Sequence, residues 1–504
     1  MEKKEVIEDQ KEKREHTQDY WNNSAPSYSD SIKKELVRDE KEIWTDLILE
    51  NAPEIPEGGR LKILDIGCGP GFFSIIMAKQ GHDVTGVDVT PNMLDEARAN
   101  AAAEGVSPEF RQMDSHEPDF ADDTFDLIIS RSVTWTLYAP EKAYAEWKRV
   151  LKPGGRLLLF DGNWYIHMFD KEKKDRLFAD VRKYREAHGD IPLRSTIFQF
   201  EDYWRELPMI GRERPLWDVS AFWQLGFGDI VVNKDLTGRL AEKETSVIYA
   251  STPMFMIRGT KMTEEEEIKN DMKTLFDGQS PLFGLELDRL LDTEDDSFYK
   301  KCIKPLLPGS GGKLLDAGCG AGLISAFAAK DGFDVTGVDF APRMIDEYAH
   351  TMDKHDIKAE GAVSDLECLS FGDDTFDVVV LKDVLWCCLK PDMALNECIR
   401  VLKPGGRLVV ADSDRYLHLH NKDKAEYVKK WRAMSEATNK VLYGVDDRRA
   451  AVIDKIADKL PLSSEKRPDW DREYLKQKGL VLEEVVIVDE RDTLPEGFVA
   501  SFVK

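Results

Sequence analysis

The stretch ILDIGCGPG at residues 63–71 decides the fold, because it recurs as LLDAGCGAG at residues 314–322. The segments VTGVD, DDTFD and RVLKPGGRL also occur twice, and the offset is 251 residues each time. Aligning residues 62–161 with 313–412 without a gap gives about 44 identities in 100 positions. Solenoid repeats have periods of only about 20–50 residues. A repeat of this length therefore indicates a duplicated domain.

Each copy alternates short apolar runs with stretches of helical periodicity. In the first copy the runs are LKILDI, HDVTGVD, FDLIIS and RLLLFD, and in the second they are KLLDA, FDVTGVD, FDVVVL and RLVVAD. This alternation is typical of βαβ units, which form a mainly parallel sheet with helices on both faces. The sequence predicts two tandem Rossmann-like α/β domains with doubly wound sheets, at residues 1–260 and 261–504, with residues 1–17 as a charged tail.

The last part of each copy is less similar between the two. About 50 residues precede the elements RPLWD at Arg214 and RPDWD at Arg467, and we expect residues 166–213 and 417–466 to form helical lids. The first lid is aromatic, with Phe198, Phe200, Tyr203 and Trp204, and the second is less so.

Composition excludes several classes of function. The formal net charge of 70 − 95 = −25 argues against nucleic acid as a partner, because phosphate binding needs clustered Lys and Arg. No run approaches the ~18 apolar residues of a membrane helix, so no membrane insertion is expected. The seven cysteines form no CxxC pair, and neither a disulfide framework nor a metal site is predicted. We expect a soluble cytoplasmic protein, either a monomer whose two copies form a pseudo-dimer or a homodimer.

A nucleoside site is indicated in each copy by glycines and an acid. Gly67, Gly69 and Gly71 follow the first strand, and the second strand ends at Asp88, 88 − 67 = 21 residues after the first glycine. Gly318, Gly320, Gly322 and Asp339 repeat this arrangement at the same spacing. Glycines allow a sharp turn and close approach of a ligand, and the acid can accept both ribose hydroxyls. A tight structural turn would not require the acid at the same spacing twice.

Together these elements resemble class I S-adenosylmethionine-dependent methyltransferases. The matching segments include VTGVDVTPNMLDEA and FADDTFDLIIS in the first copy and VTGVDFAPRMIDEY and FGDDTFDVVVL in the second. The likeness is greatest to the small-molecule methyltransferases of ubiquinone and menaquinone biosynthesis. YWNNSAPSY, from Tyr20 to Tyr28, resembles the helix that covers the cofactor in that group. The second copy is expected to lack this cover, with GQSPLFG at residues 278–284 as a possible substitute.

The resemblance implies roles for individual residues. The six glycines would pass the methionine part of S-adenosylmethionine, Asp88 and Asp339 would hold the ribose, and Asp114 and Asp365 would receive the adenine amino group. Asp65 and Asp316 would order the loop or hold the methionine ammonium through water. Two cofactor sites are therefore expected, one in each copy.

Catalytic and substrate-binding candidates lie after the fourth and fifth strands, where open α/β sheets place ligands. Trp135 and Trp386 could form a wall of the acceptor pocket or pack in the core. Asp161, Tyr165 and His167 recur as Asp412, Tyr416 and His418. The histidines could act as bases and the tyrosines as donors, with the aspartates orienting the substrate; alternatively they cap and pack a lid helix. Tyr20 and Tyr28 complete the predicted substrate-binding set.

Three functions remain open. The chain is expected to methylate a small molecule with both copies binding cofactor. Alternatively, one copy is catalytic and the other regulatory, or the acceptor is a protein. The copies also differ at Cys387-Cys388, which replaces Thr136-Leu137 and could form a reactive thiol or metalloid site, although adjacent buried thiols are usually packing.

Overall fold

The computed structural model describes residues 2–55, 58–189, 202–240, 252–294, 298–309, 311–426, 428–429, 447–488 and 497–504. Contacts between residues divide the chain into two units, Met1–Glu264 and Glu265–Lys504, here called unit 1 and unit 2. The predicted junction at residues 260 and 261 falls at the end of strand β7, Met254–Lys261, and the first helix of unit 2, α10, is Glu264–Asp292. The predicted lid residues Phe198 and Phe200 lie outside the described ranges.

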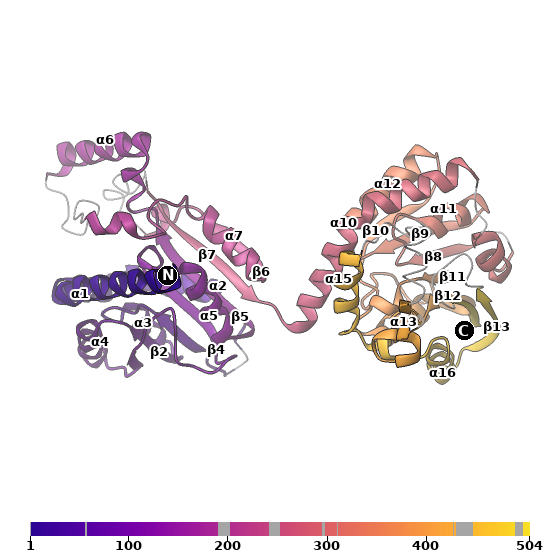
Figure 1. The fold of residues 1–504 in the computed structure, drawn as a ribbon, viewed down its shortest axis with the longest axis horizontal. Helices are drawn as coiled ribbons and strands as arrows, with labels where there is room; N and C mark the ends of the chain where they lie inside the picture. The colour runs from indigo at the N-terminus through magenta and orange to yellow at the C-terminus, as the bar shows by residue number, and fades with distance from the viewer. Residues whose placement is uncertain are drawn as a thin grey trace. The chain divides into compact units, whose positions relative to one another are not determined.

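Unit 1 contains a seven-stranded sheet with the order β3-β2-β1-β4-β5-β7-β6 (Figure 1). Strand β7 is antiparallel to both of its neighbours, and the other pairings are parallel. The elements of this unit are α1 (Glu2–Val37), α2 (Glu40–Asn51), β1 (Lys62–Ile66), α3 (Phe72–Lys79), β2 (Asp83–Asp88), α4 (Pro91–Ala103), β3 (Glu109–Gln112), β4 (Phe125–Arg131), η1 (Thr134–Thr136), α5 (Pro140–Val150), β5 (Leu151–Gly162), η2 (Ile166–Met168), α6 (Lys171–His188), η4 (Asp202–Glu206), α7 (Leu216–Gln224), β6 (Phe227–Asn233), α8 (Thr237–Leu240) and β7.

Unit 2 repeats the same topology, with the strand order β10-β9-β8-β11-β12-β14-β13. After α10 its elements are η5 (Tyr299–Ile303), η6 (Lys304–Leu306), β8 (Lys313–Ala317), α11 (Leu323–Lys330), β9 (Asp334–Asp339), α12 (Pro342–Lys354), β10 (Glu360–Val363), β11 (Phe376–Lys382), η7 (Leu385–Cys387), α13 (Pro391–Val401), β12 (Leu402–Ser413), η8 (Leu417–Leu419), α15 (Asp447–Ala457), η10 (Pro461–Ser464), α16 (Asp469–Gln477), β13 (Val481–Val488) and β14 (Gly497–Val503). The prediction of two tandem Rossmann-like domains is confirmed.

The strand order reverses direction between β1 and β4 in unit 1. The chain runs outward from β1 through β2 to β3 and then returns to β4, which pairs with the other side of β1. A crevice opens at such a switch point, outside the carboxyl ends of the strands, and ligands bind there in open α/β sheets. The glycine loop after β1 leads into this crevice. The topology therefore places the predicted site residues at one edge of the sheet.

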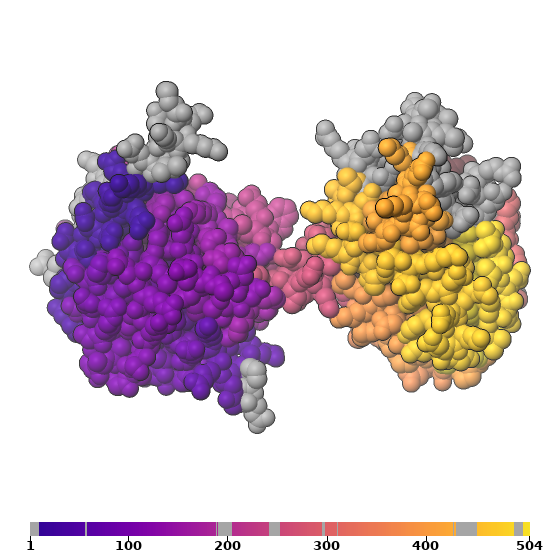
Figure 2. All heavy atoms as spheres, turned by 60° about the horizontal axis from the view of Figure 1, so that its bottom comes forward, coloured from indigo at the N-terminus to yellow at the C-terminus, as the bar shows by residue number. Residues whose placement is uncertain are grey.

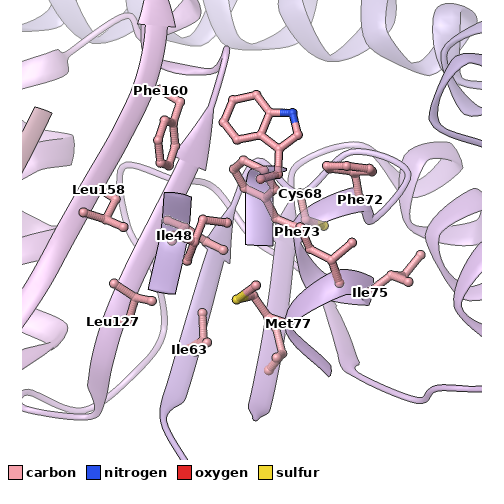
Figure 3. Close-up of a cluster of buried hydrophobic side chains, with 14 of the residues drawn as sticks. Ile48, Ile63, Cys68, Phe72, Phe73, Ile75, Met77, Leu127, Leu158 and Phe160 are labelled. Atoms are coloured by element: carbon pink, nitrogen blue, oxygen red, sulfur yellow. The ribbon is translucent and has the colours of Figure 1, made fainter. Parts of the chain in front are cut away.

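A buried apolar cluster holds the glycine loop in place. Figure 3 shows Ile63 of β1, Leu127 of β4 and Leu158 of β5 facing the side chains of α2 and α3. Phe72 and Phe73, the first two residues of α3, are each 2 % exposed, and Cys68 of the loop packs in the same cluster. The strand residues are fully buried because both faces of the sheet are covered by helices. Burial of the Phe72 and Phe73 rings fixes the position of the glycine loop, which directly precedes them in the chain.

The first helix covers the site of unit 1. Helix α1 contains the whole YWNNSAPSY segment, with Pro26 inside the helix, and Figure 2 shows its indigo atoms on the outside of unit 1. Its buried residues Ala25, Ile32 and Leu36 face the unit. The predicted charged tail is the beginning of this helix. Asn22 accepts a hydrogen bond from the backbone N–H of Asn92, at the start of α4, over 3.3 Å.

Unit 2 has a covering helix of its own, so the expected lack of a counterpart is wrong, whereas the suggested substitute GQSPLFG does lie in that helix, α10. In α10, Asp277 accepts a hydrogen bond of 2.9 Å from the N–H of Arg343, which is the counterpart of Asn92. Asp277 thus takes the place of Asn22, and Pro281 takes that of Pro26. Equivalent residues of α1 and α10 are 255 positions apart, whereas those of the two sheets are 251 apart. An alignment at the offset of 251 therefore does not pair the two helices. LFDGQSPLF is the equivalent segment.

Candidate functional site

The glycine loop of each unit turns where a side chain would not fit. Gly67 has φ +63°, and a Cβ at this position would lie 2.4 Å from Cγ2 of Val133. Gly318 has φ +78° and an equally close approach to Val384, at 2.2 Å. Only glycine combines the left-handed backbone with this contact. Gly71 and Gly322 instead face the protein, against the helices that follow β2 and β9.

Two buried aspartates order the loop from inside the protein. Asp65 accepts hydrogen bonds from the N–H and Oγ of Ser74 over 2.9 and 2.7 Å, and Asp316 makes the same bonds with Ser325. Burial raises the pKa of both carboxyls to about 6, although the serine hydrogen bonds act in the opposite direction. This geometry supports the loop-ordering alternative for Asp65 and Asp316.

The acid at the end of the second strand faces the loop. Asp88 accepts hydrogen bonds from the N–H of Gly69 at 3.0 Å and of Thr90 at 2.9 Å, one on each carboxylate oxygen. Asp339 makes the same pair of bonds with Gly320 and Ala341, at the same two distances. Each carboxylate oxygen can accept a second hydrogen bond. Both aspartates therefore retain acceptor capacity for the two hydroxyls of a ribose.

The predicted adenine carboxylates are bound by cations of the covering helices. Asp114 accepts hydrogen bonds from His116 (N–H 2.9 Å, Nδ1 2.8 Å) and the Tyr138 hydroxyl (2.9 Å), and Arg14 of α1 lies 3.3 Å away. Burial favours the neutral acid, but His116 and the hydroxyl of Tyr138 hold the pKa of Asp114 well below its usual range.

Unit 2 has a simpler version of this arrangement. Nζ of Lys269 in α10 lies 2.6 Å from Asp365 and 2.6 Å from Glu367, which stands where unit 1 has His116. Lys269 and Arg14 are equivalent at the helix offset of 255 residues.

A cavity in unit 1 joins most of the predicted cofactor residues. It is lined by the residues Arg14, Thr17, Trp21, Tyr28, Gly67, Gly69, Val87, Asp88, Val89, Thr90, Met93, Met113, Asp114, Ser115, His116, Arg131, Ser132, Val133, Thr136, Leu137 and Tyr138. Asp65 and Gly71 lie behind the loop and are not part of the lining. A nucleoside joined to an amino acid fits this set of groups, because the cavity combines acceptors at Asp88 and Asp114 with a glycine loop that admits close approach.

The predicted acceptor aromatics form a buried cluster next to the cavity. Trp135, Tyr165 and Trp204 pack with Tyr20 and Trp21 of α1, and the Trp21 and Trp135 ring centroids are 6.2 Å apart. Of these residues only Trp21 lines the cavity, and Tyr28 lines it beside Gly69. In unit 2, Phe276 of α10 packs on Trp386 at 6.3 Å, and Trp386 packs on Tyr416 at 4.6 Å.

Asp161 and Asp412 each form an ion pair with a buried arginine. In the sequence these arginines stand out only as the first residue of the repeated RPxWD element. Arg214 donates to Asp161 over 3.1 Å and forms two bonds with Asp218, and all three side chains are at most 1 % exposed. Asp161 also accepts bonds from Thr134, Trp135, Gly162 and Trp164. Arg467 bridges Asp412 and Asp471 in unit 2. The substrate-binding assignment of Asp161 and Asp412 stays a prediction.

The two histidines are the middle residues of the short turns η2 and η8, which follow the fifth strand of each unit. Burial lowers the pKa of His167, an effect that the carbonyl of Trp164 partly offsets. His418 lies with Nδ1 2.9 Å from the carbonyl oxygen of Arg415 and Nε2 3.6 Å from a carboxylate oxygen of Asp454. A neutral imidazole can accept a proton, so His167 has the charge state of a general base at neutral pH.

The thiols of Cys387 and Cys388 are directed at the protein backbone. Both Sγ atoms lie near the carbonyl oxygen of Val384, at 2.9 and 3.6 Å. The neighbouring Cys388 thiol and burial raise the pKa of Cys387 well above its ordinary value. Because the thiolate is the reactive form, this environment favours the packing interpretation.

The missed residues of the site include the cationic and aromatic side chains Arg14, His116, Arg131, Tyr138 and Arg214. His116 and Tyr138 stack at 3.7 Å between ring centroids. The repeat of RPxWD was the only sequence signal for Arg214, and nothing distinguished the other four from surface residues.

In the described ranges, no helix is long and apolar enough to cross a bilayer.

Each unit combines a switch point in strand order with a glycine loop and a carboxylate at the end of the next strand, an arrangement that is typical of nucleoside-binding α/β domains. A family model described as methyltransferase domain matches residues 64–159 and 315–410. Each unit therefore contains a segment that matches the methyltransferase-domain model, and the resemblance to S-adenosylmethionine-dependent methyltransferases is confirmed.

Curated relatives match part of the chain. An uncharacterized protein of Mycobacterium bovis is 32 % identical over 27 % of this chain and 47 % of its own length. The 2-methyl-6-phytyl-1,4-hydroquinone methyltransferase of Synechocystis sp. is 43 % identical over 22 % of this chain and 34 % of its own. This chain thus spans about half or less of the length of these two relatives. The structure of a SAM-dependent methyltransferase from Methanosarcina mazei matches 40 % of this chain and 96 % of its own at 24 % identity, with a TM-score of 0.29.

Proposed function

We propose that both units bind S-adenosylmethionine and that the protein transfers its methyl group to a small-molecule acceptor. The observation that carries the proposal is the matched loop geometry: Gly69 with Asp88 and Gly320 with Asp339 form the same 3.0 Å hydrogen bond, each beneath a covering helix. A domain that had lost its ligand would not be expected to keep this arrangement. The relative from Synechocystis, named for a hydroquinone, supports a small-molecule acceptor.

When bound, S-adenosylmethionine would supply a methyl group whose carbon a nucleophile attacks in line, while the carbon–sulfur bond breaks and S-adenosylhomocysteine leaves as the thioether. The protein has to align the two reactants and exclude water, which can contribute up to about 7–11 kcal/mol to lowering the barrier. We assign alignment of the acceptor to Trp135 and Tyr165 with Tyr20 and Tyr28 in unit 1, and to Trp386 and Tyr416 in unit 2. His167 and His418 would remove a proton from the acceptor, and the bound Asp161 and Asp412 would orient the neighbouring turns.

The first expected result is a stoichiometry of two. Titration calorimetry of the full chain with S-adenosylmethionine, and with S-adenosylhomocysteine, should show two cofactor molecules bound per chain. One molecule per chain would favour the alternative of one catalytic and one regulatory unit. Absence of binding would contradict the proposal. A second measurement follows the transfer of a labelled methyl group in a cell extract that has been filtered to remove macromolecules. Transfer in the filtered extract would indicate a small acceptor, and its loss on filtration would indicate a protein acceptor.

Replacing His167 by alanine should lower turnover more than cofactor affinity. General bases contribute about 10²–10⁴-fold to rate, whereas nothing places His167 against the glycine loop. The test compares His167→Ala with wild type in the Asp339→Ala background, so that unit 1 alone is measured, with transfer of labelled methyl as the rate and calorimetry as the affinity. His350→Ala, an exposed histidine of α12, is the control. Equal losses of rate and affinity would indicate a packing role.

A further inference from the structure

The cavity of unit 1 contains two arginines that lie at different places. Arg14 is held against Asp114, the predicted adenine carboxylate. Arg131 is the last residue of β4, beside β1, and Val133 two residues later closes on Gly67. Arg131 therefore belongs to the glycine-loop end of the cavity and Arg14 to the adenine end. An elongated ligand that placed its base near Asp114 would direct its other end to Arg131.

Arg131 is held rigidly by aromatic rings. Its guanidinium carbon lies 4.6 Å from the ring centroid of Phe72, 5.0 Å from that of Phe73 and 5.3 Å from that of Trp44. The side chain is 14 % exposed. Cation–π contacts with three rings hold the guanidinium in place.

The hydrogen-bonding capacity of Arg131 is only partly used. Nη1 donates to a carboxylate oxygen of Glu35 in α1 over 3.0 Å, and Arg131 makes no other hydrogen bond with the residues that the structure describes. A guanidinium has five N–H donors. Nε and Nη2 of Arg131 are not among the fully buried nitrogen atoms of the described residues that lack a partner, so both keep some exposed surface. The remaining donors are thus available at the wall of the cavity.

We propose that Arg131 receives the methionine carboxylate of S-adenosylmethionine in unit 1. The carboxylate is the anionic group of this ligand, and it lies at the opposite end from the adenine. A planar guanidinium matches a carboxylate through two parallel hydrogen bonds. The inference rests on the proposed function and extends it to a recognition residue that distinguishes the amino-acid part of the cofactor from its nucleoside.

Unit 2 has a different environment at this position. Lys382 is the counterpart of Arg131, and its Nζ lies 2.6 Å from Asp383, which replaces Ser132. A lysine is a point charge without the planar fork of arginine, and here it already pairs with a carboxylate. The test is therefore made on unit 1, with unit 2 silenced by Asp339→Ala.

The experiment compares S-adenosylmethionine with its decarboxylated form, which keeps the adenosine, the sulfonium and the amine. Calorimetry is done on the full chain carrying Asp339→Ala. In this background Arg131→Gln should lower the affinity for S-adenosylmethionine about 10- to 100-fold, which corresponds to the loss of hydrogen bonds to a charged group. Affinity for the decarboxylated form should change little. Arg111→Gln, an exposed arginine of β3 paired with Glu109, is the charge-matched control and should affect neither ligand.

A purely structural role for Arg131 gives a different pattern. Equal weakening of both ligands by Arg131→Gln, or weakening of neither, would overturn the inference and leave the proposed function intact. If Arg131→Gln does not fold, Arg131→Lys is used in its place. Arg131→Lys should lose part of the preference for S-adenosylmethionine over its decarboxylated form. Glu35→Gln, in contrast, should retain this preference. Binding of neither ligand by the chain with Arg131 intact would overturn the proposed function and the inference with it.

Discussion

Replacing Arg214 by methionine is expected to lower the free energy of unfolding of unit 1 by about 3–5 kcal/mol, because removal of one partner from a buried ion pair leaves its charge uncompensated. Arg214 is 1 % exposed and holds both Asp161 and Asp218, so two buried carboxylates lose their cation together. The hydroxyl of Tyr144, 2.6 Å from Asp218, would remain as a donor to one of them.

Arg212→Met is the matched control for this prediction. Arg212 lies two residues away, but its side chain is 29 % exposed and pairs with the exposed Glu141 over 3.1 Å. An exposed ion pair contributes only about 0–1 kcal/mol, so the control should lose little stability.

Urea unfolding followed by tryptophan fluorescence is a suitable measurement for both variants. Eight of the eleven tryptophans lie in Met1–Glu264, and the signal therefore reports mainly on unit 1. Similar losses for Arg214→Met and Arg212→Met would contradict the assigned role of the buried network.

Asp88→Ala should remove cofactor binding from unit 1, and Asp339→Ala should remove it from unit 2. Each substitution deletes charge-assisted hydrogen bonds to the ribose, worth about 1.5–3 kcal/mol apiece, so two of them correspond to a loss of affinity of about 100-fold or more. Each also frees the N–H of Gly69 or Gly320 and so loosens the loop. Calorimetric stoichiometry should fall from two to one in each single variant and to zero in the double variant.

The control for the ribose prediction lies on the same strand. Asp83 begins β2 at the opposite end from Asp88 and is exposed, so Asp83→Ala should retain both sites. Asp334→Ala serves the same purpose for β9 in unit 2. Unchanged affinity at both sites in Asp88→Ala and Asp339→Ala would show that these carboxylates do not hold the ribose.

The sequence was sufficient to predict the fold and the centre of the site, for a local reason. Strand periodicity, the glycine turn and the acid 21 residues later are all encoded within about 25 consecutive residues. Gly69 and Asp88 meet because β1 and β2 are adjacent parallel strands, and consecutive strands of a βαβ unit usually pair.

The covering helix of unit 2 and the cations of the cavity were not predictable in this way. The offset between the copies changes from 255 residues in the covering helices to 251 in the sheets, so an alignment without gaps does not pair LFDGQSPLF with YWNNSAPSY, and GQSPLFG could be named only as a possible substitute. Arg14 and Asp114 are 100 residues apart, and Arg131 and Glu35 are 96 apart. A charged residue on a helix has the same sequence pattern whether it faces water or a carboxylate on another element.

By itself the sequence determined that this protein is a duplicated Rossmann-like domain with a glycine loop and a carboxylate in each copy, because these features follow from short-range order along the chain. Only the tertiary structure decided which polar residues face the cavity. Asp65 is buried against Ser74, Asp161 is bound by Arg214, and Arg131 reaches the cavity wall, because burial and pairing depend on segments that meet only after folding.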